Sequence, residues 1–379
     1  MPVQLETVRG RRGRRRFVAL ARKFRGASPH FVAPLTGEIA KQLDPARNPA
    51  LRTMAQRLWI ARDRGGNARG RIAASFEPAH AECLGEAAGW FGFFDADEPK
   101  VAALLLARAV EWLRDQGAVA MLGPADPDTN HECGCLIEGH DEMPYMMMPH
   151  HPRHYADWFE AAGMCKAKDL LAYEAHASRF PMDRLRAVVD RALSRGRFEI
   201  VPITRRQLPW LLDVAVEVYN SAWRENWGFL PMSREEFAFE ARSMKPLLDP
   251  GLAKVATHDG RPAGFVLGLP DVNQALHAID SKLFPFGILR LPRLLKKIDR
   301  MRVLALGVVP EFRNKGLEAA LVYQISKYSI DHGMPTSEMS WLLEDNKAMI
   351  SLAETLGGRL SRRFRIYRLP LVPAAGSPS

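Results

Sequence analysis

The chain of 379 residues is long enough for two domains of ordinary size, and a hydrophobic content of 47% is typical of globular proteins. A formal net charge of +10 favours an anionic partner, such as a nucleotide, a nucleic acid or a membrane surface. Four cysteines are too few for a disulfide framework, and no run approaches the ~18 apolar residues of a spanning helix. We therefore expect a cytoplasmic protein without a transmembrane segment, with peripheral membrane contact left open.

The first half predicts an alternation of strands and helices. Arg9–Arg16 runs into apolar residues at helical spacing, which favours a basic helix packed by its phenylalanine face, with a nucleic-acid arm as the alternative. Turn residues between two apolar runs then predict a hairpin. The expected elements are the hairpin Leu58–Arg62 and Arg69–Phe76, strand Trp90–Phe94, helix Lys100–Leu113, strand Ala118–Gly123, helix His154–Ala162 and strand Lys168–Tyr173.

Two polar clusters of the first half bear on ligands. Asp95–Pro99 places three carboxylates and a proline between a strand and a helix, where they would repel a diphosphate. His131, Cys133, Cys135 and His150–His154 invite a metal site, but their spacing is not that of a zinc knuckle. We expect no metal, and a structural or substrate-shaping role for this half.

The second half repeats the same order of elements. It is expected to follow a connecting helix at Pro181–Ser194, and the loop Asn226–Pro231 is aromatic enough to line a cleft. A capping box, Ser233 with Glu236, predicts the start of one helix. The expected elements are strand Phe198–Ile203, helices Leu208–Trp223 and Ser233–Leu247, hairpin Leu252–His258 and Ala263–Leu269, and strands Thr336–Leu343 and Arg359–Leu369.

An insertion, residues 272–300, interrupts this order before the next strand. It interleaves apolar residues with lysine and arginine between Lys282 and Lys297. A lid over a substrate channel is the favoured interpretation, and contact with a membrane surface is the alternative.

The stretch Val303–Val322 predicts a buried strand, a turn and a helix. Unpaired amide N–H groups and the positive end of the helix dipole would point into the turn around Gly316, where a glycine lets an anion approach the backbone. Arg313 and Lys315 add positive charge. The turn is therefore a candidate diphosphate cradle.

This stretch, with Arg313-x-x-Gly316 after a strand, resembles the acetyl-coenzyme A loop of the GCN5-related N-acetyltransferase (GNAT) superfamily. Asn346-x-x-Met349 and Leu356-Gly357-Gly358 follow at the superfamily's usual offsets. The resemblance covers roughly residues 198–370, with a weaker echo in the first half. Two positions depart from the pattern: Glu318 replaces the usual glycine or alanine, and Ala353 replaces the tyrosine that protonates the departing thiolate in many members.

The resemblance implies an α/β fold of two tandem GNAT-like domains, each with a mixed, mostly antiparallel sheet flanked by helices. The central strand pair of the C-terminal domain should splay apart. We expect a degenerate N-terminal domain at 1–176, a linker helix at 177–197, a C-terminal domain with the cofactor site at 198–370, and a disordered tail at 371–379.

The expected site lies in the C-terminal domain. A carboxylate held in the cleft could have its pKa raised by burial and serve as base, directly or through water. The catalytic candidates are Glu338, Ser340 and Glu344. The cofactor-binding candidates are Leu306, Gly307, Val308 and Val309 for the pantetheine arm, Arg313, Asn314, Lys315, Gly316, Leu317, Glu318 and Ala319 for the diphosphate, and Asn346, whose plain role is a helix N-cap.

The implied enzyme is an acyl-CoA-dependent N-acyltransferase, with acetyl-CoA as the expected co-substrate and a small-molecule or peptide amine as acceptor. The amine would attack the thioester directly in a ternary complex. Two alternatives stay open: an aminoacyltransferase of the peptidoglycan-bridge type that uses charged transfer RNA, and a non-catalytic protein that binds acyl-CoA or scaffolds a partner. Nucleic acid is not the favoured partner.

Overall fold

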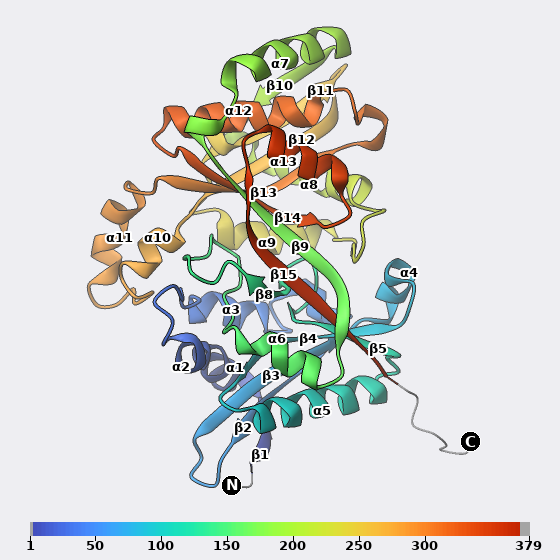
Figure 1. Ribbon diagram of the computed structural model, residues 1–379, viewed down its shortest axis with the longest axis vertical. Helices are drawn as coiled ribbons and strands as arrows, with labels where there is room; N and C mark the ends of the chain where they lie inside the picture. Colours follow the sequence, from blue (N-terminus) through green and yellow to red (C-terminus); the bar gives the residue numbers. More distant parts are fainter. Residues whose placement is uncertain (1–2, 372–379) are drawn as a thin grey trace.

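The computed structural model describes residues 3–371 (Figure 1). Of the predicted disordered tail, 371–379, Leu371 is buried and donates its amide N–H to Val119, so the prediction is wrong for this residue, and 372–379 lie outside the described residues. Within residues 3–371 one continuous sheet contains thirteen strands. Its order is β1-β2-β3-β4-β5-β15-β9-β14-β13-β12-β11-β10, with β8 paired to β15, and β6 and β7 form a separate small ribbon.

The predicted strands are present to within a few residues of their expected bounds. Four short strands that were not predicted are present as well: Gln4–Thr7, Ala125–Asp126, Glu132–Cys133 and Cys135–Glu138. The first half contributes β1 Gln4–Thr7, β2 Ala55–Arg62, β3 Ala68–Phe76, β4 Ala88–Ala96, β5 Ala120–Gly123, β6 Ala125–Asp126, β7 Glu132–Cys133, β8 Cys135–Glu138 and β9 Cys165–His176. The second half contributes β10 Phe198–Pro202, β11 Ala253–His258, β12 Arg261–Pro270, β13 Arg300–Val308, β14 Thr336–Leu343 and β15 Arg359–Pro370.

The helices flank this sheet. Those of the first half and the connection are α1 Gly10–Ala19, α2 Ala21–Arg25, α3 Thr36–Gln42, α4 Ala81–Leu84, α5 Pro99–Asp115, α6 His154–Ala161 and α7 Met182–Gly196. Those of the second half are α8 Leu208–Ala222, α9 Arg234–Met244, α10 Asn273–His277, α11 Gly287–Leu295, α12 Leu317–Asp331 and α13 Lys347–Thr355. The predicted capping box is present at the start of α9, where Ser233 and Glu236 bond each other's backbone amides. No helix within residues 3–371 combines the length and the apolar character needed to cross a membrane.

Both halves contain the same strand–helix–strand unit. In the first half β4 and β5 are parallel and α5 connects them, and in the second half β13 and β14 are parallel and α12 connects them. Their other neighbours in the sheet are antiparallel. The predicted fold, two copies of a mixed and mostly antiparallel α/β unit, is confirmed.

The two halves exchange strands at the centre of the sheet. β15, the last strand of the chain, lies between β5 and β9 of the first half, and β9 pairs with β14 of the second half (Figure 1). The predicted domain boundaries stay predictions. Each of these strand pairs joins a strand of the first half to a strand of the second, so the hydrogen-bonded sheet runs across the boundary. Each half therefore completes the sheet of the other.

In the first half, β6 fills the space beside β4, the first strand of the parallel pair β4 and β5. β6 packs against β4, where Phe93 donates its amide N–H to the carboxylate of Asp126, and a Cβ built on Gly92 would meet the Ala125 carbonyl. Asp95, predicted to begin the acidic turn, lies instead in β4; it is fully buried and pairs with Arg25 and Arg71 at 2.6 and 2.7 Å. Asp95 thus belongs to a buried ionic core, whereas Asp97 and Glu98 pair with Arg69 near the surface. The buried core is consistent with the predicted structural role of this half.

Candidate active site

The strands β13 and β14 are paired only at their beginnings. Arg300–Val303 pairs with Thr336–Met339, and beyond these residues β13 keeps pairing with β12, while β14 keeps pairing with β9. The facing edges therefore separate like the arms of a V, and their backbone groups are free of each other. The predicted splayed pair is confirmed.

A cavity of about 700 Å³ opens between the arms. Val303–Leu306 and Met339–Leu343 line its sheet side, and α8, α9 and the predicted aromatic loop cover it. The residues from these covering elements are mostly apolar and include Leu208, Leu211, Ala215, Phe229, Phe237 and Met244. A volume of this size lies within the range of roughly 300–1,000 Å³ found for small-molecule sites.

The first half contributes residues to this cavity that sequence reasoning did not assign to it. Asn130, His131 and Met147 line the cavity, as does Leu170 of β9. No sequence pattern connects these residues to β13 or β14. They reach the cavity because the two halves exchange strands. No local signal in the sequence could have found them.

His131 is held between two carboxylates at the edge of the cavity. Its Nδ1 lies 2.8 Å from Asp128 Oδ1, and its Nε2 lies 3.4 Å from Glu240 Oε1 of α9. Burial by itself lowers the pKa of His131, but the two carboxylates outweigh it and leave the pKa well above its ordinary value. The imidazole is therefore protonated near neutral pH and is poorly suited to act as a base.

The start of α12 leaves a row of backbone donors unused. Asn314 and Gly316 have positive φ angles of 60° and 81°, which turns the chain sharply into the helix. Within the described chain, the amide N–H groups of residues 314–319 donate to no protein acceptor. Such a row, at the positive end of a helix of 15 residues, is a fitting cradle for a diphosphate.

The charged side chains of this turn have different surroundings. Arg313 donates to the carbonyl oxygens of Ala222 and Val308, so its guanidinium braces the end of α8 instead of pointing freely at the cradle. Lys315 is exposed, with its ammonium 5.3 Å from the ring centroid of Phe312. Glu318 lies in the first turn of α12, where its carboxylate would oppose the approach of an anion.

The backbone between the cavity and the turn is shaped by a close aromatic contact. A Cβ on Gly307 would lie 2.8 Å from the Trp223 ring, so the glycine makes room for the tryptophan that closes this end of α8. Val309 donates its amide N–H to Ala263, and Val308 lies opposite Gly264. Of the four residues predicted for the pantetheine arm, Leu306 lines the cavity, whereas Gly307, Val308 and Val309 do not.

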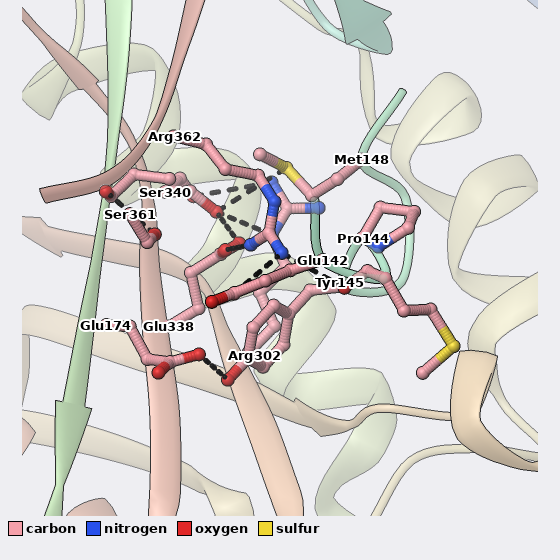
Figure 2. A network of polar contacts seen from close by, with 12 residues as sticks. Glu142, Pro144, Tyr145, Met148, Glu174, Arg302, Glu338, Ser340, Ser361 and Arg362 are labelled. Carbon is pink, nitrogen blue, oxygen red and sulfur yellow. Dashed lines mark hydrogen bonds and ion pairs between the residues drawn. The ribbon is translucent and has the colours of Figure 1, made fainter. Parts of the chain in front are cut away.

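Ser340 connects the cavity to a buried ionic network (Figure 2). Its hydroxyl donates to Glu338 Oε1 at 2.8 Å and accepts from Arg302 Nε at 3.0 Å. Glu338 in turn pairs with Arg362 of β15 at 2.9 Å. Arg302 and Ser340 line the cavity, and Glu338 and Arg362 lie behind them.

The electrostatic state of Glu338 follows from its position. The side chain is fully buried, and this burial raises the pKa of the carboxyl, while Arg362, Arg302 and the Ser340 hydroxyl oppose the shift. Glu338 does not touch the cavity itself. Any exchange of protons with a bound molecule would therefore pass through Ser340.

The remaining predicted residues separate into two groups. Glu344 accepts from Lys166 and from the Asp169 amide, and it does not line the cavity. Asn346 accepts from the Met349 amide at 3.2 Å, as predicted for an N-cap, and it also lines the cavity. The structure thus brings Leu306, Ser340 and Asn346 together around one space and leaves Glu344 outside it.

The comparisons with known proteins agree with this architecture. Residues 212–357 match the acetyltransferase (GNAT) family. The chain is 33% identical over 372 residues to a bacterial ceramide synthase from Caulobacter vibrioides, covering 94% of each protein. It is 32% identical over 359 residues to protein YghO of Escherichia coli, covering 93% of this chain and 91% of that protein. Among solved structures, a tandem GNAT protein from the clavulanic acid biosynthesis pathway superimposes with a TM-score of 0.57 at 15% identity, covering 98% of this chain and 100% of that one, which supports the fold.

Proposed function

Because this chain belongs to the GNAT acyltransferase family, we propose that it transfers a long acyl chain from coenzyme A to the amine of a lipid-like acceptor. Acyl transfer, without a particular donor or acceptor, follows from membership of the family. The acyl length, the donor and the acceptor are the proposed part. An acetyl donor, expected from the sequence, is the competing choice.

The apolar cavity between β13 and β14 is the observation that carries this proposal. An acetyl group would occupy only a small part of about 700 Å³, whereas an alkyl chain would bury its surface against the leucine, phenylalanine and methionine side chains of the lining. The relative from Caulobacter vibrioides is named a ceramide synthase, and a ceramide is the amide of a fatty acid with a long-chain amino alcohol. A related product would suit this cavity.

The donor would bind along one arm of the V and at the start of α12. The unused amides of residues 314–319 would hold the diphosphate, and the free edge of β13 near Leu306 would bond the pantetheine amides as an added strand does. This arrangement would put the thioester carbonyl between the arms, next to Ser340.

The reaction requires one bond to form and one to break. The amine nitrogen attacks the thioester carbon, the C–S bond breaks, the sulfur leaves as a thiolate that is then protonated by solvent, and the amine loses one proton. We propose that this proton passes to the Ser340 oxygen while the Ser340 hydroxyl proton passes to Glu338, because the two groups are already hydrogen-bonded. Glu338 would then be the base and Ser340 the relay.

The experiment measures thioester-dependent amide formation with palmitoyl-CoA and acetyl-CoA, each with a long-chain amino alcohol and with a short, water-soluble amine. We expect the largest kcat/KM for the pair of long-chain substrates. Preference for acetyl-CoA would overturn the proposed acyl length. Amide formation from charged transfer RNA alone, or binding of acyl-CoA without turnover of any amine, would overturn the proposed activity.

A matched pair of glycine variants tests the cradle by calorimetry with coenzyme A. Gly316→Trp should abolish binding, because a Cβ on Gly316 would already lie 3.0 Å from the Ala192 Cβ of α7, so a tryptophan there must displace the turn that presents the amides. Gly333→Trp is the control: Gly333 has the same φ of 81° beyond the other end of α12, and a Cβ placed on it would have no neighbouring atom within 4 Å. Equal binding by both variants would show that the coenzyme binds elsewhere.

A further inference from the structure

The insertion between β12 and β13, residues 272–300, contains α10 and α11 and projects from the side of the sheet (Figure 1). The sequence favoured a lid over the substrate channel, and this prediction is wrong, because none of these residues lines the cavity. The insertion joins the first residues of β13, where β13 and β14 are still paired, and the V opens toward the other end of that strand. Its exposed part therefore needs another explanation.

Residues 282–297, here called the tip segment, expose large apolar side chains. Phe284, Phe286 and Leu289 have 77%, 72% and 67% of their surface exposed, and Ile288 is exposed as well. They belong to the loop before α11 and to its first turn, so they form one patch and not scattered single residues. Such concentrations of exposed aromatic and aliphatic groups are uncommon on surfaces that face only water.

The same segment carries positive charge and no acidic residue. Lys282, Arg290, Arg293, Lys296 and Lys297 are all exposed. Within residues 3–371, the two arginines and the last two lysines form no ion pair, and Lys282 pairs with Asp280, just outside the segment. Unpaired cations around an apolar patch are the pattern of proteins that insert shallowly into an anionic membrane surface.

The base of the tip segment is tied to the body of the protein. Arg22 of α2 pairs with Asp280, His277 contacts the carbonyl oxygen of Pro29, and Gln274 bonds Asp299. These contacts hold the patch outward on a fixed support. They also place the basic N-terminal helices beside the insertion, which adds positive charge near the same surface.

We propose that the tip segment docks this protein on the surface of an anionic lipid bilayer, with Phe284, Phe286 and Leu289 inserted among the acyl chains and the neighbouring cations at the phosphate level. A second copy of the chain is a poorer occupant, because two such patches would bring the four unpaired cations of each copy together without acidic groups to compensate them. Docking would keep the enzyme at the source of lipid substrates. The inference does not depend on the proposed reaction.

Co-sedimentation of the full chain with vesicles tests the docking. We expect binding to phosphatidylcholine vesicles that contain phosphatidylglycerol, and at least tenfold weaker binding to pure phosphatidylcholine or at high salt. Phe284→Asp with Phe286→Asp should reduce binding to the anionic vesicles at least tenfold. Val188→Asp on α7, which also places a carboxylate at an exposed apolar position, should leave it unchanged.

Three outcomes would overturn the proposal: no binding to anionic vesicles, equal binding by the double variant, or equal loss in the α7 control. Sedimentation velocity without vesicles provides a second measurement. If the double variant converts a dimer of the parent chain into a monomer, the patch is a protein interface. Activity with water-soluble substrates should be the same in parent and double variant, which separates docking from catalysis.

Discussion

Ser340 is the residue at which the cavity and the buried ionic network meet. It is the one predicted catalytic residue that lines the cavity, and its hydroxyl links Arg302 to Glu338. Glu338 alone could not reach a substrate, because it is fully buried. The proposed chemistry therefore depends on the pair.

The pH dependence of the rate tests this relay. A base acts in its deprotonated form, so kcat/KM should rise with pH through the pKa of Glu338, and because burial raises this pKa, the rise should lie above the ordinary value of 4.5. Ser340→Ala should lower kcat by about 10²–10⁴-fold and should remove this rise of kcat/KM with pH. If kcat/KM of Ser340→Ala still rises with pH over the same range as that of the parent, Glu338 is excluded as the base.

Arg362 stabilises the buried carboxylate of Glu338 through a direct ion pair. Its guanidinium is almost fully buried beside Glu338. Arg362→Met should leave this carboxylate with the Ser340 hydrogen bond and the more distant charge of Arg302, and should lower the free energy of unfolding by about 3–5 kcal/mol. Urea denaturation followed by circular dichroism measures the change. The control, Arg153→Met, breaks an exposed pair with Asp141 and should cost about 0–1 kcal/mol. Similar losses in both variants would contradict this assignment.

At the scale of elements, α8 determines how much space the open strand pair offers. Ala215 faces the cavity from this helix and Val216 does not line it. Ala215→Phe should therefore reduce kcat/KM for palmitoyl-CoA at least tenfold and change that for acetyl-CoA little, because the added ring fills the space for the chain. Chain-length profiles of the parent, Ala215→Phe and the control Val216→Phe measure this. A uniform loss over all chain lengths would place the acyl chain elsewhere.

At the scale of the whole molecule, the exchanged strands make the two halves one folding unit. A fragment of residues 1–197 would lack β15, and β5 and β9 would each lose a neighbouring strand and expose unpaired edges. We expect this fragment to aggregate or to show no cooperative unfolding when produced alone, whereas the full chain unfolds in one transition. Calorimetry on both decides the matter, and a soluble, cooperatively folding fragment would show that the halves are independent domains.

The local features of this protein could be predicted from its amino-acid order. Hydrophobic periodicity and turn residues predicted the elements. The short run Thr336–Leu343 is typical of a buried strand, and Gly316 after Arg313 marks a turn into a helix that leaves amides unused. These signals lie within a few neighbouring residues, so the candidate diphosphate cradle could be found without coordinates.

Which distant residues share a site depends on how the strands pair in the folded chain. The place of β15 between β5 and β9 puts Arg362 against Glu338, and the strand exchange brings His131 of the first half to the cavity of the second. The sequence could not predict the exposure of Phe284 and Phe286 either, because the same apolar and basic pattern suits a lid or a membrane anchor. Pairing between segments far apart in the chain has no local signature, and it settles which side chains meet and which face solvent.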